Sequence, residues 1–103
     1  MTFRATDASG IVEDNLTSET LRPLLDSVAE SVIVDNPEWG DQYYAQALAH
    51  PDGSWHVEVR SGGPDRHVST TAPNTDAIFD ILRSWAAADG WWQQAFGWQR
   101  VDT

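Results

Sequence analysis

Alternating polar and apolar residues in the middle of the chain predict a three-stranded antiparallel meander. Three segments alternate in this way: Tyr43–Ala49, Ser54–Ser61 and Arg66–Ala72. The segments that join them, His50-Pro51-Asp52-Gly53 and Gly62-Gly63-Pro64-Asp65, have the composition of tight turns. Proline presets φ in such turns and glycine accepts a positive φ. Two consecutive hairpins are therefore expected here.

Pairing the residues that flank each turn gives a register for both hairpins. One face of the three strands is then apolar, because side chains alternate along a strand. Its rows are Ala45 with Val59 and Val68, Ala47 with Val57 and Thr70, and Ala49 with Trp55 and Ala72. The small side chains of the first strand allow a helix to approach closely. A slip of one residue would move every side chain to the other face.

The opposite face of these strands collects polar groups. Its rows are Tyr44 with Arg60 and His67, Gln46 with Glu58 and Ser69, and Leu48 with His56 and Thr71. An antiparallel sheet with one solvated face normally alternates apolar and polar residues. Contacts such as Arg60 with His67 are therefore explained by ordinary cross-strand stabilisation. A ligand- or partner-binding surface is the second interpretation, and it stays open.

Helical periodicity precedes and follows the meander. On the N-terminal side, apolar residues recur on one helical face: Leu21, Leu24, Leu25, Val28 and Val32. Because proline is tolerated in a first turn but not in a helix interior, Pro23 places the start of this helix near Thr20 or Leu21.

The C-terminal side predicts a second helix that is rich in tryptophan. Asn74 or Thr75 is expected to cap it, and Asp89-Gly90 to end it, with glycine as the left-handed residue. Its apolar stripe contains Ile78, Leu82, Trp85 and Ala86. A short helical turn over Trp91–Phe96 and a last strand over Trp98–Val101 are expected after it.

The remaining segments complete the predicted fold. Residues 3–12 are expected to form a short strand or hairpin around Ala8-Ser9-Gly10, Ser31–Val34 a first strand, and Asn36–Gly40 a loop. Together these elements predict a single α+β domain spanning residues 1–103. We expect an antiparallel meander of three to five strands, with an N-terminal helix and the tryptophan-rich C-terminal helix packed on one face.

Charge and composition narrow the range of partners. The chain has 103 residues with six arginines, no lysine and sixteen carboxylates, for a net charge of −10. Residues 1–41 hold nine acidic and two basic side chains. This acidity argues against nucleic-acid binding and suits a partner with a basic surface, although it also serves solubility alone. The lack of cysteine, of a long apolar run and of a signal peptide predicts a cytoplasmic protein without membrane contact.

Catalytic and metal-binding patterns are weak in this sequence. His56, Glu58 and His67 are ligand types for transition metals, but no motif such as HExxH supports a site. Ser69 with His67 and Glu58 matches a hydrolase triad in residue type only, without a nucleophile elbow. We therefore predict no metal and no cofactor, and we do not expect an enzyme.

The tryptophans are the last candidates for a functional role. Trp55 and Trp85 are expected in the core. Trp91 and Trp92 are adjacent and cannot both be buried on one face. Trp39 in its loop and Trp92 suit the core and the surface equally, and an exposed one is a candidate anchor for a partner, since tryptophan is enriched at interface hot spots.

Several short motifs lie along residues 43–101 of the chain: Tyr44-Ala45-Gln46, Asp52-Gly53, Val57-Glu58-Val59-Arg60, His67, Trp85, Asp89, Trp92 and Trp98. In these motifs the chain resembles a family of small acidic bacterial proteins, frequent in actinobacteria. The family has no established activity, so the resemblance implies a fold and no mechanism. In size, charge and aromatic content the chain is also similar to immunity proteins, which neutralise a toxin by covering its active site.

Two functional hypotheses follow. The first is a non-enzymatic protein-interaction module, immunity- or regulator-like, that uses an acidic, tryptophan-containing surface with Trp39 and Trp92. The second is a small-ligand or catalytic site on the polar face, with these candidate residues: Tyr44, Gln46, His56, Glu58, Arg60, His67 and Ser69. Self-association through a sheet edge or the polar face is a further possibility.

Overall fold

An antiparallel sheet with the strand order β2-β1-β3-β4-β5-β6-β7 forms the centre of the fold. The strands are β1 (Phe3–Asp7), β2 (Val12–Leu16), β3 (Ser31–Asp35), β4 (Tyr43–Ala49), β5 (Trp55–Ser61), β6 (His67–Ala72) and β7 (Gln99–Arg100). This computed structural model describes residues 3–7, 10, 12–27, 31–40, 42–63 and 66–101.

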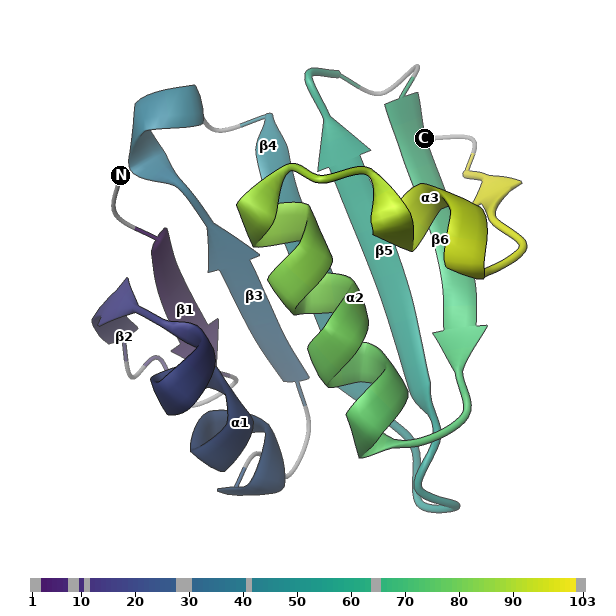
Figure 1. The fold of residues 1–103 in the computed structure, drawn as a ribbon, viewed down its shortest axis with the longest axis horizontal. Coiled ribbons are helices and arrows are strands. Elements are labelled where there is room, and N and C mark those ends of the chain that lie inside the picture. The colour runs from purple at the N-terminus through teal and green to yellow at the C-terminus, as the bar shows by residue number, and fades with distance from the viewer. Residues whose placement is uncertain are drawn as a thin grey trace.

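The helices lie on one face of the sheet, which we call the inner face (Figure 1). They are α1 (Ser18–Ser27), α2 (Thr75–Ala87) and α3 (Trp91–Ala95), and a 3-10 turn, η1 (Pro37–Trp39), follows β3. Strands β2 and β3 both pair with β1, so α1 carries the chain from one side of β1 to the other. None of the described helices combines the length and apolarity needed to cross a bilayer.

The predicted register of the meander is confirmed in every pair. Ala45 pairs with Val59 and Val59 with Val68, and the polar rows follow the same alignment, as in Gln46 with Glu58. Ala45 and Ala47 are completely buried beneath the inner-face helices. The main apolar residues of α2 are buried against the sheet: Ile78, Ile81, Leu82 and Trp85. The fold is therefore α+β, as predicted.

The expected number of strands, three to five, is too low. The predicted N-terminal hairpin extends beyond residue 12, because Val12–Leu16 forms all of β2. This strand contains Glu13, Asp14 and Asn15, which have low strand propensity. Pairing with β1 overrides that propensity, so the sequence pattern did not reveal it. Ala8 and Ser9, where the turn was predicted, lie outside the described residues.

The first helix begins earlier than predicted and contains Pro23 in its interior. Two threonines explain the earlier start. Thr17 N donates to Oγ1 of Thr20 at 2.8 Å, and Thr20 N donates to Oγ1 of Thr17 at 3.3 Å, so the side chains cap the first turn reciprocally. Burial of Leu21 and Leu25 then holds a helix that lacks one internal hydrogen bond. Val28 of the predicted stripe lies outside the described residues, and Val32 belongs to β3.

The second helix has the predicted N-cap and a different C-cap. Oδ1 of Asn74 accepts a 2.8 Å hydrogen bond from the backbone N–H of Ala77. At the other end the left-handed residue is Ala88, with φ of 56°, rather than Gly90. Gly90 is also left-handed, with φ of 79°, but it precedes α3. Two left-handed residues, Ala88 and Gly90, therefore turn the chain sharply from α2 into α3.

Candidate functional site

The sequence-predicted polar residues share one side of the sheet, which we call the outer face. The described helices lie on the other side. The cross-strand pairs place Tyr44 beside Arg60, and Arg60 beside His67. The next two rows likewise bring together the other candidates, Gln46, Glu58, Ser69 and His56. The structure thus gathers all seven residues that the second hypothesis named.

A hydrogen-bonded chain from Arg60 through His67 to Glu58 organises this face. Arg60 Nε–H donates to Nδ1 of His67 at 2.9 Å. Because Nδ1 accepts, Nε2 carries the imidazole proton in this arrangement and donates to Oε1 of Glu58 at 2.7 Å. The His67 side chain is only 5% exposed, so both of its ring nitrogens are satisfied within the protein.

The remaining polar groups extend the same network. Oε2 of Glu58 lies 3.3 Å from Nε2 of His56. Arg60 donates from Nη1 to Oε1 of Gln42 at 2.9 Å, and its guanidinium lies 5.7 Å from the Tyr44 ring centroid. These groups bind one another, which favours cross-strand stabilisation over catalysis. Among the described residues, no group of three or more histidines and carboxylates is arranged to hold a metal ion.

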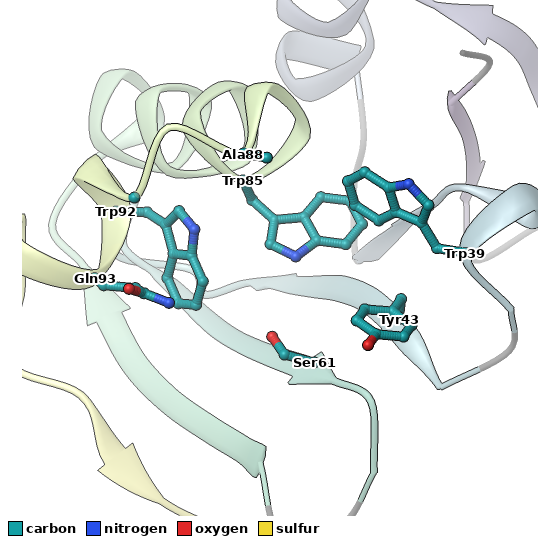
Figure 2. Close-up of a pocket in the computed structure, with 8 residues that line it drawn as sticks. Trp39, Tyr43, Ser61, Trp85, Ala88, Trp92 and Gln93 are labelled. Carbon is teal, nitrogen blue, oxygen red and sulfur yellow. The ribbon is translucent and has the colours of Figure 1, made fainter.

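The inner face contains a groove that the sequence hypotheses did not include (Figure 2). It has a volume of about 590 Å³, within the usual range of small-molecule and side-chain pockets. It lies where α2 ends, over the first residue of β4, Tyr43, and the last residue of β5, Ser61. The described residues that line it are Trp39, Tyr43, Ser61, Trp85, Ala88, Gly90, Trp92 and Gln93.

One wall of the groove is an aromatic cluster centred on Trp39. Its ring meets Trp85 edge-on at 5.6 Å between centroids, and Tyr43 at 6.2 Å. Phe3 packs against Trp39 from β1 at 5.2 Å. The buried Asn36 side chain shapes the preceding turn, because its Oδ1 accepts from the backbone N–H of Glu38 at 3.0 Å. The cluster therefore holds Trp39 in place from three directions.

The opposite wall is built by the turn between α2 and α3. The buried Ser84 hydroxyl donates to Oδ1 of Asp89 and accepts from the backbone N–H of Trp92 at 3.0 Å. Trp92 packs edge-on against Trp98 at 5.0 Å, and the Trp98 indole N–H donates to the Trp92 carbonyl at 2.7 Å. The backbone N–H of Trp91 donates to the same Asp89 oxygen at 3.0 Å. These bonds hold the Trp92 ring in the wall.

The Asp89 cap should make the stability of this turn dependent on pH. The Ser84 hydroxyl and the Trp91 N–H lower the pKa of the Asp89 carboxyl. Its stabilising contribution is therefore present above the pKa of an unfolded aspartate, about 3.9, and is lost as pH falls through the lower folded-state value. Asp89→Asn should reduce the loss in the denaturant midpoint of unfolding that accompanies a fall in pH from neutral to acidic values. Asp80→Asn on α2 is the matched control, and an equal change in both variants would contradict this role of Asp89.

The lining of the groove is aromatic and uncharged. None of the described lining residues carries a formal charge. Figure 2 shows the indole nitrogen of Trp85 and the hydroxyl of Ser61 pointing toward each other across the groove, with the Gln93 amide beneath the Trp92 ring. The groove therefore offers flat apolar walls together with several neutral hydrogen-bonding groups.

The tryptophan predictions are partly corrected by this arrangement. Trp55 and Trp85 are buried, as expected. Trp92 is also buried, at 6% exposed, whereas its neighbour Trp91 is 44% exposed. Trp39 is half-buried in the aromatic cluster. Trp39 and Trp92 thus line one groove, with Trp85 between them in Figure 2, rather than standing as separate surface anchors.

Part of this groove was visible in the sequence. Tyr43 has the same parity as Ala45 and Ala47 on the apolar face of the meander, which places its ring on the helix side. The approach of η1 and α3 to that position depends on tertiary packing, and no local sequence pattern indicates it.

A scan against protein-family models and searches of curated proteins and of solved structures return no match to this chain.

Proposed function

We propose that this chain is a non-enzymatic protein-interaction module whose inner-face groove receives a side chain of a partner protein with a basic surface. The observation that carries the proposal is the groove itself, an open cleft lined by the aromatic side chains of Trp39, Tyr43, Trp85 and Trp92. Rigid aromatic residues in a concave site are characteristic of interface hot spots.

The charge of the chain supports a basic partner. The net charge is −10, and among the residues that the structure describes three of the six arginines form ion pairs with carboxylates of the chain. Those three are Arg4 with Asp35, Arg22 with Asp76, and Arg83 with Asp80. Opposite charge on the partner would raise the association rate and favour it over acidic competitors. An immunity-type role, in which the partner is a toxin, is one form of this proposal.

The outer face supports a ligand-binding or catalytic function less well. Glu58, Arg60 and His67 bind one another directly, so a ligand would have to break existing hydrogen bonds. A side chain that enters the groove would not have to break the hydrogen bonds that join Glu58, Arg60 and His67. We therefore propose the groove as the functional surface.

Selection from a random-peptide display library tests the proposal without a known partner. We expect enriched peptides with net positive charge whose binding weakens as salt rises. Gln93→Arg places a bulky cation at the groove and should abolish the enrichment. Gln94→Arg is the matched control, because it makes the same change at the next exposed residue of α3, which does not line the groove. No enrichment, or equal loss in both variants, would overturn the proposal.

A further inference from the structure

We infer that the group received by the groove is the guanidinium of an arginine side chain. This inference rests on the proposed function and specifies the ligand of the same site. Three features of the groove lead to it: its aromatic walls, the negative end of α2 beside it, and its neutral hydrogen-bond acceptors.

The aromatic walls favour a flat cation. Indole and phenol rings carry negative potential on their faces, and guanidinium groups stack on them. Tyr43, 37% exposed, and the half-buried Trp39 offer the accessible ring surface, and the buried Trp85 and Trp92 complete the lining. The same contact occurs elsewhere in this protein, where Arg22 lies 5.7 Å from the Phe79 ring centroid.

The C-terminal end of α2 adds negative potential at the groove. Trp85 lies in the last turn of α2 and Ala88 caps it, so this side of the groove lies at the negative end of the α2 dipole, whereas Gly90 caps the N-terminus of α3. The last turn of α2 contains no basic residue to offset that end. Two exposed carboxylates are adjacent in sequence to lining residues, Glu38 beside Trp39 and Asp89 beside Ala88. Asp89 is already bound by Ser84 and the Trp91 backbone, so the α2 end and the exposed Glu38 are the groups expected to attract a cation to a groove whose described lining is neutral.

The hydrogen-bonding groups favour arginine over an ammonium group. A guanidinium presents five N–H donors in one plane, whereas an ammonium is a compact and strongly hydrated charge. The Ser61 hydroxyl points into the groove as an acceptor for those donors, and the Gln93 amide lies beside the Trp92 ring (Figure 2). The indole N–H of Trp85 can donate to a carbonyl of the partner's backbone. A peptide arginine therefore matches both the donors and the acceptors of the site.

Titration of the intact protein with short defined peptides tests the inference. The probes are four acetylated glycine-flanked pentapeptides that carry arginine, its neutral isostere citrulline, lysine or trimethyllysine at the centre. Two-dimensional NMR resolves the tryptophan indole N–H signals. We expect the arginine peptide to shift the signals of Trp39, Trp85 and Trp92, and not that of Trp55, which donates to Thr75 away from the groove. The citrulline peptide should bind about tenfold more weakly.

Two variants assign the binding to the groove. Glu38→Gln should weaken the arginine peptide about two- to fivefold without affecting the citrulline peptide, because an exposed charge contributes little. Glu19→Gln is the matched control on α1. Gln93→Arg should remove the shifts, and Gln94→Arg should retain them.

The outcomes separate this inference from the proposed function. Equal binding of arginine and citrulline, tighter binding of lysine or trimethyllysine, or no binding of any peptide overturns the arginine assignment. If the display library still yields peptides that are lost with Gln93→Arg, the interaction module stands and its ligand is a different one. If the library also yields none, both fail.

Discussion

Replacing Trp85 with alanine should lower the free energy of unfolding by about 3–5 kcal/mol, the usual cost of truncating a buried tryptophan. Trp85 is 4% exposed and joins α2 to the aromatic cluster, at 5.9 Å from Phe3 and 5.6 Å from Trp39 between ring centroids. Removal of the indole leaves a cavity between the helix and the end of the sheet. Denaturant titration followed by far-ultraviolet circular dichroism measures the loss.

Trp91→Ala is the matched control for this change. Trp91 is 44% exposed and packs on Phe96 at 6.3 Å, so its truncation should cost less than about 1 kcal/mol. Trp85→Phe keeps an aromatic ring in the cluster and should fall between the two. Equal losses for Trp85→Ala and Trp91→Ala would show that the groove wall contributes no more to stability than an exposed side chain.

Replacing Glu58 with alanine should lower the free energy of unfolding by about 1–3 kcal/mol. The substitution leaves the Nε2–H of His67 without its acceptor at 2.7 Å, in a side chain that is 5% exposed. A buried donor without a partner costs the desolvation that the hydrogen bond had offset. Glu58→Gln keeps an acceptor oxygen at this position and should cost clearly less.

A double-mutant cycle assigns the loss to the correct histidine. Glu58→Ala combined with His67→Ala should be non-additive, because one substitution already removes the contact that the other would break. Combined with His56→Ala, whose nitrogen lies 3.3 Å from Glu58, the effects should be closer to additive. Additivity with His67→Ala would contradict the hydrogen-bonded chain through His67.

The meander was predictable because three kinds of sequence information agree within it. Polarity alternates along each strand, glycine and proline mark both turns, and the register that joins them leaves one face apolar. A shift by one residue would have exposed Val57 and Val59 and buried Glu58 and Arg60. The same constraint predicted the polar rows of the outer face, although not that His67 would be almost inaccessible to solvent.

The parts that were not predicted depend on contacts between distant segments. The strand propensity of Val12–Leu16 is low, and its pairing with β1 decides its structure. The choice of Trp92 over Trp91 for burial follows from the Ser84 hydroxyl, which binds the Trp92 backbone from the preceding helix. The groove combines residues from η1, β4, β5 and both C-terminal helices, so no single stretch of sequence carries its pattern.

The balanced charges of the outer face have a consequence for how the molecule approaches others. Arg4 binds Asp35 there with bonds of 2.9 to 3.1 Å, and Arg60 is linked to Glu58 through His67. Because these charges largely cancel, the described ion pair and hydrogen-bonded chain of the outer face add little to the net charge of −10. A cationic surface attracts unpaired carboxylates within a Debye length, about 8 Å at physiological ionic strength, and these outer-face groups offer it little net charge. The outer face is therefore a poor first point of contact for a basic partner.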